Sequence, residues 1–167
     1  MGDHSETIQI DYDPTKISYS DLLAVFWDSH NPTVQPFSRQ YMSIIFYHND
    51  EQKTLVLQSK ELEEARLGHS VKTLIVPFSK FCLAEDYHQK YYLRWDNILM
   101  REFNIVYPVA EDFIASTAAA RANGYAGGYG TSATVQQEID SLGLSAEANR
   151  RLLEIADRGL RPGCPIS

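Results

Sequence analysis

Two apolar runs on either side of a well-capped helix constrain the fold of this chain more than any other feature. The runs are Met42–Tyr47 (MSIIFY) and Val71–Pro77 (VKTLIVP). Both read as strands, and the continuous first run predicts a buried central strand. Between them, Asn49 is a good N-cap and Gly68 is a typical helix terminator, so a helix is predicted over roughly 50–67. This order of elements favours an α/β core.

The residues before this core predict one more strand and one more helix. Thr7–Tyr12 alternates apolar and polar residues and ends at Asp13-Pro14, which is typical of a strand followed by a turn. Ser18 is a good N-cap, and Asp21 three residues later is a short substitute for the Glu of a capping box. The helix that begins there carries a wide apolar face, and Asn31-Pro32 should stop it.

The pattern becomes mostly helical in the second part of the chain. A helix is predicted from about Ala84 to Trp95, and the helical pattern continues from Asn97. The Gly-rich stretch NGYAGGYG at 123–130 is a break, read as a loop rather than a nucleotide site because no Lys-Ser/Thr follows it. Two short helices, roughly 131–142 and 145–158, follow. The sequence therefore predicts an α/β core over 1–95 and a helical extension over 96–167.

Charge and composition exclude several classes of function. The formal net charge of −7 and the lack of a basic run argue against nucleic acid or anionic membranes as main partners. No apolar stretch approaches the roughly 20 residues that span a bilayer. Cys82 and Cys164 are far apart and show no metal-ligand spacing, so a reducing compartment, the cytosol, is the predicted location.

Three separated segments together resemble one family. They read GDHSETIQIDYDPTKISYSDLLAVFWDSHNPT, RQYMSIIFYHNDEQK and AEDYHQKYY, and they cover about residues 2–92. They are similar to the A-type peptide methionine sulfoxide reductases, which share a Gly-His-Xaa-Glu segment, Tyr-Asp-Pro, Phe-Trp-Xaa-Xaa-His, Gln-Tyr-Xaa-Ser and Ala-Glu-Asp-Tyr-His-Gln in this order. The resemblance implies an α+β fold, the second half of a ferredoxin-like two-layer core followed by a C-terminal helical appendage.

The resemblance also implies an activity. Members of the family reduce peptide-bound and free methionine-S-sulfoxide to methionine, a repair reaction in oxidative stress, with thioredoxin as the reductant and no bound cofactor. A thiolate attacks the sulfoxide sulfur, a proton must reach its oxygen, and the enzyme thiol becomes a sulfenic acid that another thiol reduces. Nothing in this chemistry requires a metal, and the five histidines show no ligand spacing.

Carried over by motif, the resemblance gives three candidate site residues. Glu6 would be the proton donor to the sulfoxide oxygen, because a carboxyl group in an apolar pocket can stay protonated near neutral pH. Tyr41 would be a second donor, and His4 would line the substrate pocket beside Glu6. The alternatives from the residues alone are a solvated carboxylate at position 6 and a core aromatic at the start of a strand at position 41.

The sequence departs from the family pattern where the nucleophile is expected. The family's Gly-Cys-Phe-Trp segment does not occur in the 167 residues, and the loop before Gln40 lacks the family's Asp. We therefore expect an N-terminally truncated member with little turnover of its own. The alternative is a non-catalytic binding or regulatory isoform of the same family, with a mitochondrial location possible for a longer form.

The remaining cysteines and histidines have plainer interpretations. Cys82 lies in KFCLAED and is predicted to be a buried, inert thiol. Cys164 is either an exposed tail thiol or the counterpart of the resolving cysteine that some members carry near the C-terminus. Ala126 stands in the Gly-rich stretch where many members have a resolving cysteine. His30 and His88 are expected to make structural hydrogen bonds.

Overall fold

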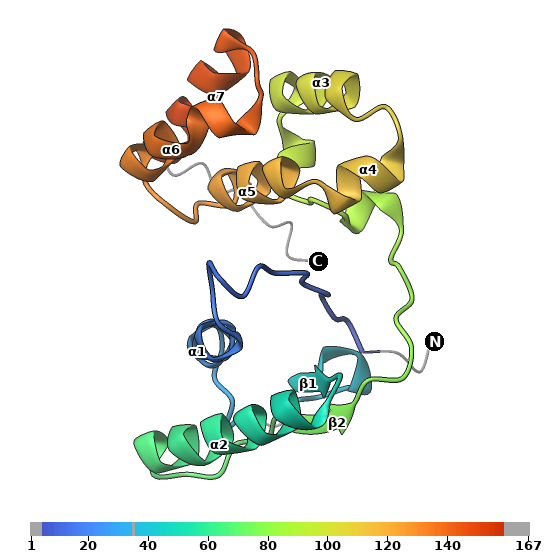
Figure 1. The fold of residues 1–167 in the computed structure, drawn as a ribbon, viewed down its shortest axis with the longest axis vertical. Coiled ribbons are helices and arrows are strands. Elements are labelled where there is room, and N and C mark those ends of the chain that lie inside the picture. Colours follow the sequence, from blue (N-terminus) through green and yellow to red (C-terminus); the bar gives the residue numbers. More distant parts are fainter. Residues whose placement is uncertain (1–4, 35, 159–167) are drawn as a thin grey trace. The chain divides into compact units, whose positions relative to one another are not determined.

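The structure is a computed structural model, which describes residues 5–34 and 36–158 of the chain (Figure 1). The chain forms two compact units, Met1–Phe81 (unit 1) and Cys82–Ser167 (unit 2). Each unit has its own cluster of buried apolar side chains. The two are described separately below.

Unit 1 is a strand–helix–strand element preceded by a helix. Its elements are listed in chain order: α1 (Tyr19–Asp28), the 3₁₀ helix η1 (Arg39–Tyr41), β1 (Ile44–Tyr47), α2 (Asp50–Leu67) and β2 (Leu74–Pro77). β1 and β2 pair in parallel, with Ile44 opposite Leu74 and Tyr47 opposite Pro77. The helix α2 is the crossover that a parallel pair requires, and it lies alongside both strands in Figure 1.

The capping residues form the bonds that the sequence predicts. The Ser18 hydroxyl accepts from the Asp21 backbone N–H at 3.1 Å, and the Asp21 carboxylate accepts from the Ser18 N–H at 3.0 Å. The Asn49 side chain accepts from the N–H of Gln52 at 2.8 Å, and Gly68 ends α2 with a left-handed φ of 69°. The predictions of both helices are confirmed.

The core of unit 1 lies between the two helices and one face of the sheet. Its buried members are Leu23, Trp27, Ile45, Val56 and Val71. The indole N–H of Trp27 donates to the Ser59 hydroxyl at 3.1 Å, so the polar edge of this aromatic ring stays hydrogen-bonded inside the core.

One strand prediction is wrong, and another is wrong in part. Thr7–Tyr12 forms no strand, and its apolar side chains Ile8 and Ile10 are 80% and 52% exposed. A strand exists only where a neighbour accepts its backbone hydrogen bonds, and alternation alone does not supply that neighbour. Met42–Tyr47 was predicted to be a buried central strand, but β1 is shorter, pairs with β2 alone among the described residues, and buries only Ile45.

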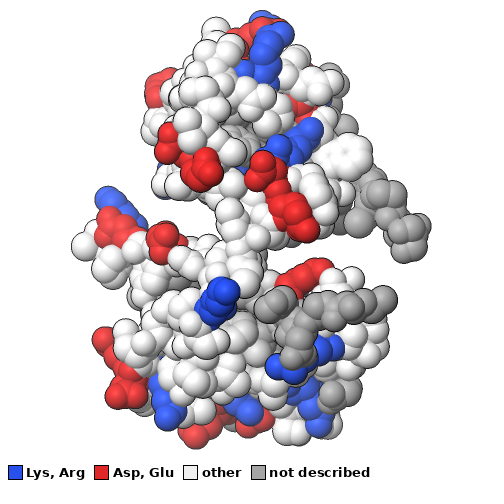
Figure 2. All heavy atoms as spheres, turned by 90° about the vertical axis from the view of Figure 1, so that its right-hand side faces the viewer, with Lys and Arg blue, Asp and Glu red and all other residues white. Residues whose placement is uncertain are grey.

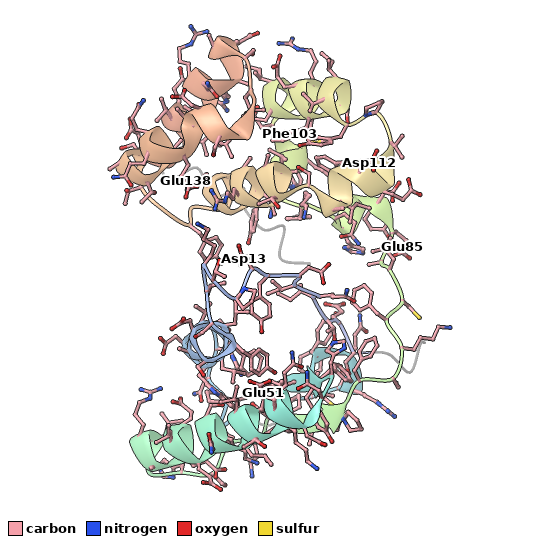
Figure 3. The ribbon with its side chains drawn as sticks, in the orientation of Figure 1. Asp13, Glu51, Glu85, Phe103, Asp112 and Glu138 are labelled. Atoms are coloured by element: carbon pink, nitrogen blue, oxygen red, sulfur yellow. The ribbon has the colours of Figure 1, made fainter. Side chains whose placement is uncertain are left out.

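Unit 2 is helical. Its elements are listed in chain order: η2 (Asp86–His88), η3 (Leu93–Trp95), α3 (Asn97–Val106), α4 (Ala110–Ala115), α5 (Thr117–Ala126), α6 (Ser132–Glu138), η4 (Ile139–Leu142) and α7 (Ala146–Arg158). Fully buried side chains from several of these elements, among them Leu93, Leu99, Phe103, Val135 and Leu152, fill the core. In Figure 3, Phe103 points from α3 into this unit, whereas Glu85 and Asp112 lie on its outside.

The predicted helix from Ala84 to Trp95 is wrong, because the structure has two short 3₁₀ turns there, η2 and η3. Lys90 adopts a left-handed φ of 52° between them, which interrupts a right-handed helix. The backbone N–H of Leu93 donates at 3.1 Å to the side-chain oxygen of Asn123, thirty residues away. A long-range partner thus replaces the local helical bond, and no local pattern shows it.

The end of the chain follows its predicted organisation. Gly143 has a left-handed φ of 68° and separates η4 from α7 as expected. Asp96 caps α3 by accepting from the N–H groups of Ile98 and Leu99, both at 3.1 Å. Its other oxygen accepts from Nε of Arg151 in α7 at 2.6 Å, so one carboxylate fixes two helices of unit 2.

The fold is therefore helix-rich and mixed, with a small two-stranded parallel sheet in unit 1 and a helical unit 2. The predicted combination of α and β structure with a C-terminal helical part is confirmed at this level. Within residues 5–34 and 36–158, no helix is both long and apolar enough to cross a membrane. Figure 2 shows basic and acidic side chains interspersed over the face drawn, without a patch of one sign.

Candidate functional site

The segment that carries Glu6 is held against η1, the 3₁₀ helix that carries Tyr41. The backbone N–H of Glu6 donates to the carbonyl of Gln40 at 2.9 Å, and the side-chain amide of Gln40 donates to the Glu6 carboxylate at 2.7 Å. The Ser5 hydroxyl donates to the carbonyl of Arg39 at 2.9 Å. Three bonds thus join residues 34 positions apart in sequence and hold the Glu6 segment against η1, the element that carries Tyr41.

The surroundings of these two donors are open. The Glu6 side chain is exposed, and Tyr41 is 53% exposed. The ring of Phe37, itself 88% exposed, lies 5.2 Å from that of Tyr41 between centroids. The apolar pocket expected around Glu6 is not formed by the residues that bond to it. Phe37 supplies an apolar surface next to Tyr41 instead.

The residue that joins the two donors is Gln40, which the sequence reasoning did not select. It contacts Glu6 through both its backbone carbonyl and its side chain. The signal was present, because Gln40 is the first residue of the Gln-Tyr-Xaa-Ser motif. Its amide donates to the carboxylate and so fixes one carboxylate oxygen, leaving the other oxygen for a ligand.

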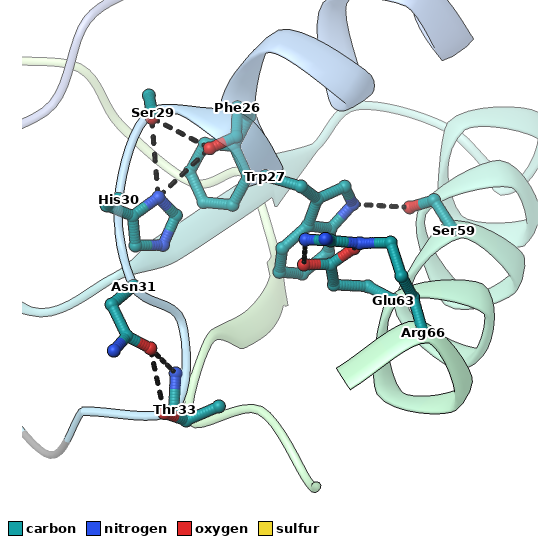
Figure 4. Close-up of polar contacts among 9 residues, drawn as sticks. All are labelled: Phe26, Trp27, Ser29, His30, Asn31, Thr33, Ser59, Glu63 and Arg66. Atoms are coloured by element: carbon teal, nitrogen blue, oxygen red, sulfur yellow. Dashed lines mark hydrogen bonds and ion pairs between the residues drawn. The ribbon is translucent and has the colours of Figure 1, made fainter. Parts of the chain in front are cut away.

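The histidine at the end of α1 makes the structural hydrogen bonds that were expected, so the prediction for His30 is confirmed. Its Nδ1 lies 2.9 Å from the carbonyl of Phe26, and its Nε2 lies 2.8 Å from the Ser43 hydroxyl. Figure 4 shows the ring beside Phe26, with the Trp27–Ser59 bond on the other side of α1. Nε2 of the other histidine, His88, lies 4.0 Å from a carboxylate oxygen of Glu85.

An ion pair on α2 has one buried partner, Glu63, and one exposed partner, Arg66. Arg66 donates to Glu63 through Nε at 2.8 Å and through Nη2 at 2.6 Å, as Figure 4 shows. The Glu63 side chain is only 7% exposed. The bonds from Arg66 hold the pKa of the Glu63 carboxyl below its usual value, although desolvation opposes them. This pair is a structural element, since it contacts no predicted site residue.

The remaining sequence predictions concern His4 and the two cysteines. His4 and Cys164 lie outside the described residues. Cys82 is exposed, so the prediction of a buried thiol is wrong. The reason is that KFCLAED forms no regular element that could bury its apolar residues, and Leu83 is 58% exposed as well.

The described residues offer neither a metal site nor an enclosed pocket near Glu6 and Tyr41. In the part of the chain that the structure describes, no three His, Cys, Asp or Glu side chains group closely enough to hold a metal ion. A hollow of about 300 Å³ is lined by Gln9, Ile10, Asp11, Tyr12, His48 and Gln52. It is wide open, and its lining does not include Glu6 or Tyr41.

The chemistry available at this site is proton donation or hydrogen bonding to an acceptor. A carboxyl group held against the helix that carries the phenol, with an exposed aromatic ring beside that phenol, suits a small polar oxygen attached to an apolar group. Residues 1–81 contain no cysteine, so unit 1 itself supplies no sulfur nucleophile. Any reaction that needs a thiol must take it from elsewhere.

Comparison with known families matches nearly the whole chain. The profile of the family described as peptide methionine sulfoxide reductase matches residues 1–118. A second profile, described as the helical domain of selenoprotein methionine sulfoxide reductase A, matches residues 110–156, which lie in unit 2.

Individual relatives carry corresponding names. A peptide methionine sulfoxide reductase of Drosophila melanogaster is 39% identical over 147 residues, which is 87% of this chain and 58% of the relative. Peptide methionine sulfoxide reductase A5 of Oryza sativa subsp. japonica is 34% identical over 95% of this chain and 60% of the relative. The enzyme MsrA of Methanosarcina acetivorans is 47% identical over 53% of this chain and 51% of the relative. The chain thus spans between half and two thirds of the length of these three proteins.

Proposed function

The chain belongs to the peptide methionine sulfoxide reductase family, and from this membership we propose that it takes part in reducing peptide-bound and free methionine-S-sulfoxide to methionine. The observation that carries the proposal is the pair of bonds between Glu6 and Gln40. They hold Glu6 against η1, which carries Tyr41, and this supports the proposal that the carboxyl group and the phenol act on the same substrate.

In this reaction the two donors act on the sulfoxide oxygen. The phenol of Tyr41 and, when it carries a proton, the carboxyl group of Glu6 donate to that oxygen, which draws electron density from the sulfur and makes it more open to attack by a thiolate. The exposed ring of Phe37 offers an apolar contact to the S-methyl group. The sulfoxide sulfur gains two electrons and becomes a thioether, while the thiol sulfur takes the oxygen and becomes a sulfenic acid.

The thiol is the part of the reaction that unit 1 does not contain. We propose that the 167-residue polypeptide binds sulfoxide and turns it over slowly or not at all. Its sequence has only Cys82 and Cys164, both outside residues 1–81. This same observation favours the second candidate function, a binding or regulatory isoform that recognises oxidised methionine without reducing it.

Calorimetric titration with a short N-acetylated peptide that contains methionine-S-sulfoxide tests binding in the absence of reductant. Loss of one hydrogen bond is worth about 1 kcal/mol, so we expect Glu6→Gln and Tyr41→Phe each to weaken binding about fivefold. Glu61→Gln on the exposed face of α2 and Tyr129→Phe in unit 2 are the matched controls and should bind as the unchanged chain does. Failure of the unchanged chain to bind would overturn the proposal.

A turnover assay separates the two candidate functions. The chain is incubated with the same peptide and dithiothreitol, and methionine is measured by chromatography. Binding with negligible turnover supports the binding isoform. Rapid turnover that Cys82→Ser abolishes would show that this exposed thiol is the nucleophile and would contradict the slow-turnover proposal.

Finer features of the protein extend this proposal. We take residues 1–95 to be the second half of a ferredoxin-like core, followed by a helical extension over 96–167. The parallel strand–helix–strand order supports this assignment. Thioredoxin is the proposed reductant, in line with the family. A cytosolic location fits the two widely spaced cysteines, of which Cys82 is a free thiol.

A further inference from the structure

A line of hydrogen bonds in unit 1 passes through Ser43, which lies two residues after Tyr41. It begins at the carbonyl of Phe26 in the last turn of α1 and runs through the ring of His30 to the Ser43 hydroxyl, with bonds of 2.9 and 2.8 Å. From Ser43 it continues to the hydroxyl of Thr73 at 2.8 Å. Thr73, just before β2, is only 2% exposed, so the far end of the line is buried.

The direction of these bonds follows from the acceptor at one end. A carbonyl oxygen can only accept, so Nδ1 of His30 must carry the proton that it donates to Phe26. The Ser29 hydroxyl, 3.3 Å from Nδ1, donates to the same carbonyl at 2.7 Å, so it too can only accept from Nδ1 (Figure 4). In the neutral ring Nε2 is then an acceptor. Ser43 donates to Nε2 and accepts from Thr73, and every hydroxyl in the line has a partner.

Ser43, in the segment that follows Tyr41, is held by hydrogen bonds of both its backbone and its side chain. Its carbonyl accepts from the Leu74 N–H at 3.0 Å, and its hydroxyl is held on both sides by His30 and Thr73. Tyr41 lies two residues before it, at the end of η1. Gln40, which binds Glu6, lies three residues before it. Met42 alone lies between Ser43 and Tyr41, and its N–H donates to the carbonyl of Arg39 at 3.3 Å, so a shift of Ser43 is passed along the backbone to η1.

We propose that His30 is a positioning residue for Glu6 and Tyr41, acting through Ser43. The inference rests on the proposed function, because it assumes that these two donors bind the sulfoxide oxygen. The ring of His30 is hydrogen-bonded to residues in and just after α1 and to Ser43 just before β1, and so it acts on the two donors only indirectly. Its role is to connect the end of α1 with the chain between η1 and β1.

Two substitutions at position 30 test the hydrogen bonds of the two ring nitrogens separately. The side-chain amide of His30→Asn reaches the position of Nδ1, and that of His30→Gln reaches the position of Nε2. We expect His30→Asn to lose the bond to Ser43 and to weaken binding of the methionine-S-sulfoxide peptide about fivefold, the effect of one hydrogen bond. His30→Gln should retain most of the affinity, because its amide oxygen can accept from Ser43.

Substitutions along the line test it without changing the ring. Ser43→Ala and Thr73→Val remove one hydroxyl each, and Thr73→Ser restores the hydroxyl at that position. Ser59→Ala is the matched control, since it removes a bond of similar length to Trp27 in the same core but lies off the line. We expect Ser43→Ala to raise hydrogen exchange of the Glu6 amide, which donates to Gln40, about fivefold, whereas Ser59→Ala should not.

The tautomer of His30 can be measured without any ligand, and it tests the proposed direction of the hydrogen bonds. Long-range ¹H–¹⁵N spectra of the unchanged chain at about pH 8 should show His30 with its proton on Nδ1. A proton on Nε2 would contradict the line of bonds. Unchanged Glu6 exchange and peptide affinity in both His30→Asn and Ser43→Ala would overturn the positioning role. If the exchange rates change as expected while the unchanged chain binds no sulfoxide, the positioning role stands and the proposed function fails.

Discussion

Replacing Asp96 should destabilise unit 2 more than any other single change of a surface carboxylate in that unit. Its Oδ1 accepts from two backbone N–H groups at the start of α3, and its Oδ2 accepts from Nε of Arg151 at 2.6 Å. The Asp96 and Arg151 side chains are 11% and 27% exposed, so solvent screens their attraction only in part. The same contact raises the pKa of Arg151.

Capping α3 and bonding Arg151 each contribute separately to the free energy of unfolding. An N-cap is worth about 1 kcal/mol, and a charge-assisted bond about 2 kcal/mol. Asp96→Ala removes both and should cost about 3 kcal/mol, which corresponds to roughly 100-fold faster exchange of the α3 and α7 amides that open with the whole unit. Asp96→Asn keeps the capping oxygen and should cost about 2 kcal/mol.

The control is an ion pair of the same unit in solvent. Glu147 and Arg101 are 2.8 Å apart with side chains 50% and 56% exposed, so Glu147→Gln should change the free energy of unfolding by less than about 0.5 kcal/mol. Hydrogen exchange measured by mass spectrometry on the full chain compares the stability of unit 2 in the three variants Asp96→Ala, Asp96→Asn and Glu147→Gln. Equal exchange in Asp96→Ala and Glu147→Gln would refute the reasoning from burial and capping.

Two further predictions concern the two cores. Phe103→Ala in unit 2 should cost about 3–5 kcal/mol of unfolding free energy because Phe103 is fully buried between other side chains, whereas Ile105→Ala, at 71% exposed, should cost less than about 0.5 kcal/mol by urea denaturation. The lowered pKa of Glu63 contributes stability above its ordinary value of 4.5, and this stability is lost as the pH falls through the folded-state value. On acidification, the free energy of unfolding of unit 1 should therefore fall less in the Glu63→Gln variant than in the unchanged chain. An equally steep fall in both proteins would contradict the role of Arg66.

Local signals predicted the helices α1 and α2 well. Ser18 with Asp21, Asn49 and Gly68 each make the bond or adopt the backbone conformation that their residue types favour. These effects act within four residues, so the sequence contains all that decides them. The boundaries of α1 and α2 were accordingly predicted to within a few residues.

Features that depend on distant partners were not predictable in the same way. Thr7–Tyr12 has a strand pattern, but a strand needs a neighbour for its backbone bonds. The segment before Trp95 has a helical pattern, but Asn123 takes the N–H of Leu93. Likewise, the motif gave Glu6 and Tyr41 as candidates, while the role of Gln40 in joining them became visible only in three dimensions.

The proposal that Glu6 and Tyr41 bind a sulfoxide oxygen is tested most directly by two-dimensional ¹H–¹⁵N spectra of the full chain. The chain is titrated with peptides that contain the S-sulfoxide, the R-sulfoxide or unoxidised methionine. We predict that only the S-sulfoxide shifts the resonances of Glu6, Gln40 and Tyr41, including the Gln40 side-chain amide that donates to Glu6. Shifts confined to unit 2, or equal shifts with all three peptides, would contradict it.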